Sequence, residues 1–420
     1  RITIRDGVVR VLRADGEPYE VSHVSGDVTL ASLAEIAGNL SARLDQGPTL
    51  SAEVATRGLV SDGAFSARQA AGTLKIASDG PIDLGRLTRV LAPEAAVDGQ
   101  VTLAVDGVFN PGDVRATIDT SFSELRSAAV SGVKPLDASL RGNVQVTTER
   151  LAAKLDLASP AGTATADLAY ALTDRPPAVT AEQVLAAVLG GESLTLPDFS
   201  LRATASIDLA AVEAAVPGLL TLRAGQQVTR GRLELSDLAA SGGAAPAARG
   251  ALELRDLSVS SDGTTVRPEP IALSFDAAVE PGQGLRVRQA DLRTAFATLT
   301  AAGAVDDLSA TFKADLARLQ SELGPLVDLG QSNLSGQLEG HVQLAKAGED
   351  AYRLRADAAA TGVRYEQAGR PVEMRSARAQ HEGRITLRGG RPGRVDAERV
   401  EVDLDGQVVA AGQGWYDCLL

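Results

Sequence analysis

Side chains that commonly catalyse reactions or bind metals are few in this sequence and lie far apart. His23, His341 and His381 are the only histidines, and no His-Glu-x-x-His spacing occurs. Cys418 is the only cysteine, which excludes an intrachain disulfide and a metal site built from several cysteines. The sequence has no Gly-x-Ser-x-Gly elbow, P-loop or dinucleotide fingerprint. We therefore expect three surface histidines on strands, and no metal, cofactor or catalytic residue.

Carboxylates are the one reactive group that the sequence supplies in quantity, and two of them can hydrolyse a glycosidic bond. Asp403 and Asp405 are an example, because residues two apart on a strand share one face. With 54 acidic residues in the chain, however, a solvated charged face is favoured over a catalytic pair. Sugar-binding sites also favour exposed aromatics, and Trp415 is the only tryptophan. We therefore predict that the protein is not an enzyme.

Composition narrows the class of protein further. The 420 residues suffice for two or three domains, or for one extended array of repeats. Apolar residues make up 44% and aromatics only 3%, so aliphatic side chains must supply most of the buried surface. The net charge of −13 argues against a nucleic-acid partner, because a phosphate backbone requires a basic face. No apolar stretch approaches the roughly 18 residues of a membrane-spanning helix, and we expect any membrane anchor upstream of this fragment.

Alternation of apolar and polar residues with a period of two dominates the chain and predicts β-strands. Clear examples are Val101-Leu103-Val105, Leu233-Leu235, Ile271-Leu273-Phe275 and Leu338 with Val342-Leu344. One face of each strand is therefore apolar and the other polar, which favours antiparallel pairing. Segment 239–249 has the composition of a flexible loop, and we interpret it as a loop within one continuous sheet.

One phrase occurs three times: an Asp-Leu pair, a short helical run closed by proline, and a glycine that begins an alternating strand. The copies run from Asp83 through Pro93 to Gly99, from Asp208 through Pro217 to Gly231, and from Asp315 through Pro325 to Gly336. Their aspartates are 125 and then 107 residues apart, which predicts approximate repeat units 1–80, 81–206, 207–313 and 314–420. We interpret each aspartate as a helix N-cap in preference to a Ca²⁺ or headgroup ligand.

Helices are predicted only over 31–39, 83–91, 180–189, 208–216 and 315–323, each about nine residues long. So little helix cannot cover the apolar face of a long sheet. Either the sheet closes on itself as a sandwich or barrel, or the apolar face stays open as a groove for an apolar ligand.

The repeated phrase resembles the AsmA-like and TamB-like family of bacterial envelope proteins. The stretch from Leu334 to Gly340, Leu-Ser-Gly-Gln-Leu-Glu-Gly, is the most typical part. The resemblance implies an all-β fold: an elongated, curved antiparallel sheet that forms an open hydrophobic groove, with a few short helices between strands. It also implies a periplasmic protein, anchored in the inner membrane, that conducts phospholipids between the inner and outer membranes or aids outer-membrane assembly. The expected partners are phospholipid acyl chains and other envelope proteins.

The residues expected to line the groove are those of the clearest alternating strands. They are Val101, Leu103, Val105, Leu233, Leu235, Ile271, Leu273, Phe275, Leu338, Val342 and Leu344. The leading alternative is a structural or adhesive β-array, closed as sandwiches or wound as a solenoid, that carries no lipid. A carbohydrate-active β-helix enzyme is a third reading, and the scarcity of aromatics counts against it.

Overall fold

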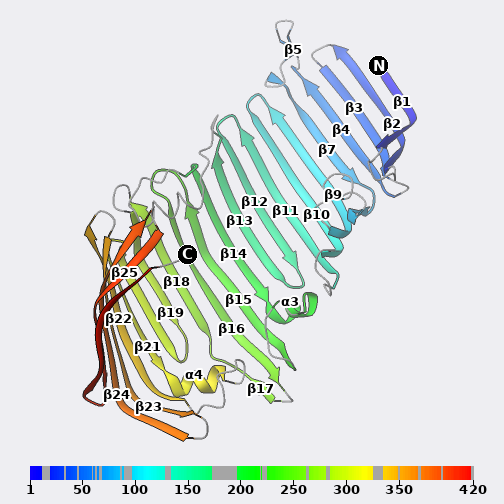
Figure 1. Cartoon of the computed structure of the whole chain (residues 1–420). Helices are drawn as coiled ribbons and strands as arrows, with labels where there is room; N and C mark the ends of the chain where they lie inside the picture. The colour runs from blue at the N-terminus through cyan, green and yellow to red at the C-terminus, as the bar shows by residue number, and fades with distance from the viewer. Residues whose placement is uncertain are drawn as a thin grey trace. The chain divides into compact units, whose positions relative to one another are not determined.

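The fold was analysed in a computed structural model of the whole chain (Figure 1). The structure describes residues 1–11, 19–32, 35–44, 47–58, 60–61, 64–65, 69–85, 88, 97–127, 134–172, 196–217, 219, 225–261, 264–280, 284–324, 334–348, 351–367, 370–388 and 391–417. The predicted fold class is confirmed, because 81% of the described residues are in strands and 24 described strands form an open antiparallel sheet that does not close into a barrel. Two compact units are distinguished, Arg1–Asp174 with Ala211–Leu219 and Arg175–Ala210 with Leu220–Leu420.

The first of these, the N-terminal unit, is an antiparallel meander in which strands that follow one another in sequence pair in space. Its main strands are β1 (Ile2–Val11), β2 (Tyr19–Ser32), β3 (Glu35–Leu44), β4 (Thr49–Arg57), β7 (Ala71–Ser78), β9 (Val97–Asn110), β10 (Asp113–Ser127), β11 (Leu136–Thr147), β12 (Arg150–Ser159) and β13 (Gly162–Ala171). The short β8 (Ile82–Asp83) pairs with β9, and β5 (Val60–Ser61) and β6 (Ala64–Phe65) form a separate small hairpin.

The second, the C-terminal unit, continues the same pattern of antiparallel neighbours. Its strands are β14 (Phe199–Asp208), β15 (Gln226–Ser241), β16 (Ala247–Ser261), β18 (Ile271–Glu280), β19 (Gly284–Arg293), β20 (Ala297–Ala304), β21 (Asp307–Asp315), β22 (Ser335–Gly348), β23 (Ala351–Gln367), β24 (Arg370–Arg388), β25 (Arg391–Leu404) and β26 (Gln407–Asp417). The short β17 (Thr264–Val266) pairs with β16. Within this unit the sheet curves between β18 and β25 (Figure 1).

Two short helices are described, α3 (Leu209–Ala215) and α4 (Leu316–Leu323), and both begin directly after the aspartate of a repeated phrase. Asp315 caps α4, because its carboxylate accepts a hydrogen bond from the backbone N–H of Arg318 at 3.0 Å. The predictions over 208–216 and 315–323 are thus confirmed. In the first phrase Leu84, Gly85 and Thr88 are helical, while the rest of 84–91 and the helix predicted over 180–189 lie outside the described residues.

The helix predicted over 31–39 is wrong. Its described residues belong to β2 and β3, where Ile36 pairs with Leu30 on one side and Thr56 on the other. Ala, Leu and Glu favour a helix locally, but pairing on both sides of the strand outweighs this preference of a few tenths of a kcal/mol per residue.

The loop predicted over 239–249 is shorter than expected. β15 extends to Ser241 and β16 starts at Ala247, so only residues 242–246 connect them. The two strands pair directly, with Ala239 opposite Arg249. The segment is therefore a hairpin connection within the C-terminal unit, in agreement with the interpretation as a loop inside one sheet.

The glycine of each repeated phrase lies opposite a one-residue bulge in the neighbouring strand. The bulged residue has a left-handed backbone, and the glycine opposite it also has a positive φ. The three pairs are Gly99 with Glu124 (φ 135° and 55°), Gly231 with Asp256 (158° and 53°) and Gly336 with Gly362 (123° and 61°). A bulge increases the local twist of a strand, so the phrase places a helix and a twist at the same point of each copy.

Candidate functional site: an uncovered apolar face

The register of the N-terminal unit joins apolar side chains of ten successive strands into a continuous row. From β1 to β13 this row is Ile4, Gly26, Leu40, Ala52, Ile76, Val105, Ile118, Gly142, Leu155 and Ala166. The row one residue away faces the other side of the sheet and is polar throughout: Thr3, Asp27, Asn39, Glu53, Lys75, Asp106, Thr117, Asn143, Lys154 and Asp167. Because side chains alternate between faces, the unit has one apolar face and one polar face.

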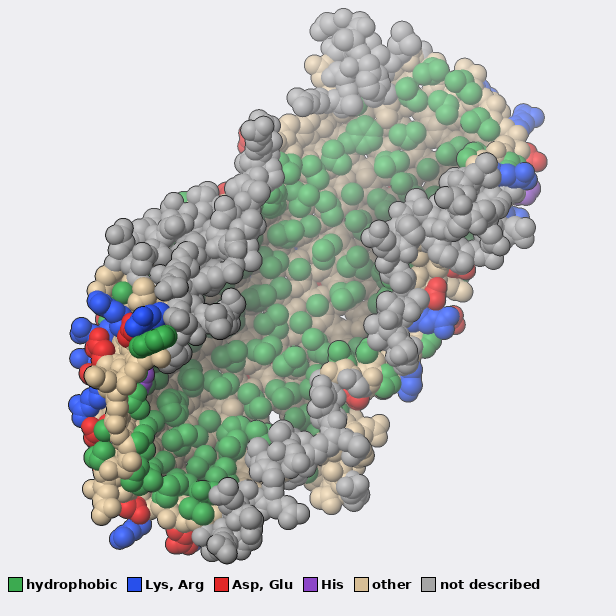
Figure 2. Space-filling view, in the orientation of Figure 1, with side chains coloured by type: hydrophobic (Ala, Val, Ile, Leu, Met, Phe, Trp, Pro, Cys, Tyr) green, Lys and Arg blue, Asp and Glu red, His purple; other side chains and the backbone are tan. Residues whose placement is uncertain are grey.

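The C-terminal unit has the same arrangement over twelve strands. From β14 to β26 its apolar row is Ala205, Leu235, Leu252, Leu273, Leu292, Leu299, Phe312, Gly340, Ala358, Ala379, Val402 and Ala410. On the opposite face lie charged neighbours such as Glu234 beside Glu253 and Lys313 beside Glu339. Figures 1 and 2 show that the apolar face lies on the inner side of the curved sheet in this unit.

In neither unit does a second layer of the described residues cover this face. Leu40 and Leu157 of the N-terminal unit are each 44% exposed, and Leu273 and Leu299 of the C-terminal unit are 36% and 38% exposed. Figure 2 shows hydrophobic side chains gathered on the visible face of each unit. Full burial of a leucine contributes about 1.5–3 kcal/mol, so each of these side chains retains surface that an apolar ligand could cover.

The register places all eleven predicted groove residues on the apolar face of their units. Val101, Leu103 and Val105 lie in the N-terminal unit, and the other eight lie in the C-terminal unit. Leu235 and Leu273 belong to the apolar row of the C-terminal unit described above. The adjacent rows of the same face contain Leu233, Ile271, Phe275, Leu338, Val342 and Leu344. Val101 is only 8% exposed and pairs with the buried Ile82, so it presents little surface to a ligand.

Several large residues of the apolar face were missed by sequence reasoning, among them Ile118, Leu155, Leu299 and Phe312. Ile118 and Leu155 lie in strands that alternate between apolar and polar residues, so this alternation could have identified them. Leu299 and Phe312 have small residues, Ala301 and Ala310, at the next position of the same face, so only their cross-strand pairing identifies them as neighbours. The face is therefore broader than the sequence predicted.

The three histidines, predicted to be surface residues of strands, occupy different positions. His23 contacts Asp6, with 2.6 Å between Nδ1 and Oδ1, and His341 lies on the polar face opposite Thr311 and Asp357. His381 instead belongs to an apolar-face row and is only partly exposed. The described residues bring no histidine together with two other potential ligands into a metal-binding group.

The two carboxylates of the candidate pair each accept a hydrogen bond from the backbone. Asp403 accepts a hydrogen bond from the backbone N–H of Gly406 at 2.9 Å, and Asp405 accepts one from that of Ser376 at 2.8 Å. Asp405 lies in the turn between β25 and β26, with a φ of 53°. Each carboxylate thus stabilises backbone in or beside this turn.

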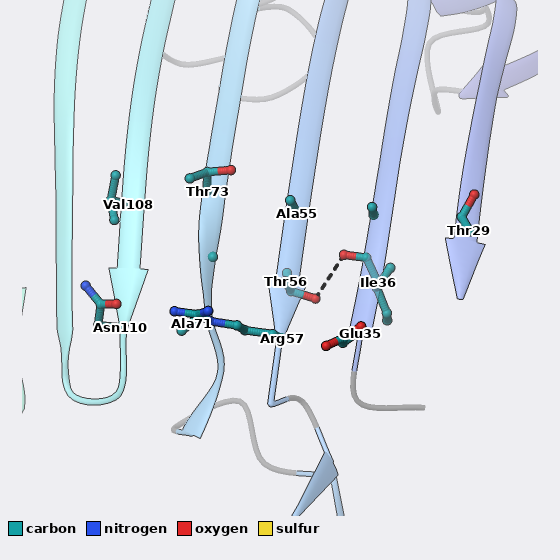
Figure 3. Close-up of a pocket in the computed structure, with 12 residues that line it drawn as sticks. Thr29, Glu35, Ile36, Ala55, Thr56, Arg57, Ala71, Thr73, Val108 and Asn110 are labelled. Atoms are coloured by element: carbon teal, nitrogen blue, oxygen red, sulfur yellow. Dashed lines mark hydrogen bonds between the residues drawn. The ribbon is translucent and has the colours of Figure 1, made fainter. Parts of the chain in front are cut away.

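Four shallow depressions of about 490, 510, 280 and 490 Å³ lie mainly on the polar faces, away from the apolar rows. Figure 3 shows the first, where Ala55, Thr73 and Val108 lie on adjacent strands. The second is bordered by ion pairs, Lys75 with Asp106 at 3.7 Å and Lys154 with Asp167 at 3.6 Å. Because these hollows lie mainly on the polar faces, the continuous apolar face is the candidate site for an extended apolar ligand.

Comparison with known proteins adds no relative: no protein-family model, curated protein or solved structure matches this chain. Among the residues that the structure describes, no helix has the length and apolar character needed to span a membrane.

Proposed function

We propose that the apolar face binds phospholipid acyl chains and conducts them along the sheet. The observation that carries this proposal is the pair of uninterrupted apolar rows, which cross ten strands in one unit and twelve in the other. Contiguous apolar surface of this kind, on which Leu40, Leu157, Leu273 and Leu299 stay a third or more exposed, is typical of a face that binds an apolar partner.

The chemistry of the face suits an acyl chain better than a polar ligand. The rows consist of Ala, Val, Leu, Ile, Phe and Gly, which offer no directional hydrogen bonds from their side chains. Each buried CH₂ of a lipid contributes about 0.8 kcal/mol without requiring a particular position along the row. Such a surface holds a chain and lets it move, whereas a lining of hydrogen-bonding groups would fix it in place.

The resemblance of the repeated phrase to the AsmA-like and TamB-like family supports the same proposal. On this basis the protein acts in the periplasm, anchored to the inner membrane by a segment outside this chain. It carries phospholipids between the inner and outer membranes or assists outer-membrane assembly with other envelope proteins. No step of this role requires catalysis or a cofactor.

The proposal is tested by inserting one charge into the apolar face of each unit. Leu103→Asp and Leu273→Asp place a carboxylate where acyl chains would lie, and desolvating that charge would cost far more than the lost contact. We expect both variants to lose most co-purifying phospholipid, measured by mass spectrometry of organic extracts, while β-type circular dichroism is kept.

Matched controls are available one residue away on the polar face. Thr102→Asp and Ala272→Asp add the same charge to the same two strands, on the polar side. Thr102 lies opposite Ser121, and Ala272 lies between Glu253 and Arg293 of the neighbouring strands. These variants should keep their lipid. Loss of lipid in the controls as well, or a wild-type protein that never carries lipid, would favour the structural or adhesive array.

A further inference from the structure

The smallest of the four depressions differs from the other three in its charges. It has a volume of about 280 Å³ and lies on the polar face of the C-terminal unit. Its charged lining residues are Arg202, Arg249, Arg288 and Asp276, and Ser200 and Ser241 add two hydroxyl groups. Three guanidinium groups and one carboxylate give this hollow a formal charge of +2, in a chain whose net charge is −13.

Two of the arginines face each other across a single alanine. Arg202 on β14 is opposite Ala239 on β15, which is opposite Arg249 on β16. Two strand spacings separate the two arginines by about 9.6 Å between backbones, and the small alanine forms the floor between them. The register therefore creates a notch with one guanidinium group on each side.

The carboxylate nearest to the notch in the strand register is that of Asp276, which lies opposite Arg249. Arg288 is paired with Asp276, at 3.3 Å between Nη1 and Oδ1. Within the described part of the chain, neither Arg202 nor Arg249 has an acidic group within ion-pair distance. By contrast, Lys313 and Arg378 in the hollow beside His341 are each paired with a carboxylate, at 3.8 and 3.5 Å.

The number of donors selects the class of anion. A carboxylate has two oxygens, which a single guanidinium fork can satisfy. A phosphate group presents three or four oxygens and can accept from two forks on opposite sides. We propose that the notch between Arg202 and Arg249 binds a phosphate group, carried either by a soluble phosphate or by a phospholipid headgroup at a membrane surface.

The experiment compares two double variants of the full chain that remove the same charge. Arg202→Gln with Arg249→Gln removes the notch, while Arg255→Gln with Arg364→Gln removes two arginines that are paired with Glu253 at 2.6 Å and Glu373 at 3.2 Å. Binding of inorganic phosphate is measured by calorimetry. Binding to vesicles of phosphatidylglycerol, with phosphatidylcholine vesicles as reference, is measured by co-sedimentation, and circular dichroism checks the fold.

We expect saturable binding in at least one arm, weakened about tenfold or more by the notch variant because two charge-assisted hydrogen-bonding partners are lost. The paired control should bind like the wild type. Binding in the phosphate arm assigns a soluble ligand, and binding only to phosphatidylglycerol vesicles assigns a headgroup. The proposal is overturned if neither arm shows binding, or if the two double variants bind equally.

Discussion

At the scale of single residues, the aspartate of the repeated phrase acts on the backbone. Asp315 accepts from the Arg318 backbone N–H and from the side-chain amide of Gln337, at 3.0 and 2.8 Å. These hydrogen bonds, with that from Arg318 the larger cause, lower the pKa of Asp315 below its ordinary value. Its interpretation as a helix cap is thereby confirmed, and the same position before α3 is occupied by Asp208.

A pKa lowered in the folded state predicts how stability depends on pH. The ionised Asp315 stabilises the fold at pH values above the unfolded pKa of about 3.9, and this contribution disappears as pH falls through the lower, folded-state pKa. Asp315→Asn retains a capping side chain but removes the charge. We expect a lower thermal midpoint than wild type at pH 7, and convergence of the two proteins as the pH falls below 3.9.

Circular dichroism melts at pH 7 and at stepwise lower pH measure this difference. Asp315→Ala, which removes the cap altogether, should stay less stable than Asp315→Asn at every pH. A difference between wild type and Asp315→Asn that does not change with pH would show that the charge of Asp315 is not stabilising.

At the scale of elements, all three repeated phrases share a β-bulge opposite their glycine. A Cβ on Gly336 would lie 2.9 Å from the Cα of Val363, and one on Gly99 would lie 2.9 Å from the Cα of Leu125. On Gly231 it would contact Leu209 of α3 and Leu257, each at 3.2 Å. The glycine thus allows two backbones, or a strand and a helix, to approach closely.

Replacement of such a glycine should destabilise the protein measurably. Gly336→Ala combines a φ of 123° with a backbone contact below 3 Å, and we expect a loss of about 1–3 kcal/mol in the free energy of unfolding. Gly348→Ala, in the same strand, is the control, because its Cβ would meet only the Ala351 Cβ at 3.8 Å. Urea unfolding followed by circular dichroism compares them, and equal midpoints would refute the role of the bulge.

The elements also show which features the sequence can predict. Alternation such as Val101-Leu103-Val105 identifies strands and their apolar side, because side-chain direction depends only on position along the strand. It does not identify partners across strands. The notch between Arg202 and Arg249 forms because both residues lie opposite Ala239. That register depends on the shifts near Ala203 and Ser236. For segment 31–39, local helix preference misled because residues 35–39 pair with residues 27–32 on one side and with residues 53–57 on the other.

At the scale of the whole molecule, few of the described side chains are completely buried. Among the described residues only Val259 has a large side chain that is fully buried. Stability therefore rests mainly on strand pairing and on contacts along the apolar rows. The central claim of the proposed function is that the uncovered side of those rows binds lipid.

The most direct test is to identify what touches the apolar face in the cell. Leu273→p-benzoylphenylalanine places a photo-crosslinking side chain on that face, and Ala272→p-benzoylphenylalanine places it on the polar face of the same strand. After illumination, intact-protein mass spectrometry reports any added mass. We predict phospholipid adducts at position 273 and none at position 272. Adducts at neither position, or in equal amounts at both, would contradict a lipid-binding apolar face.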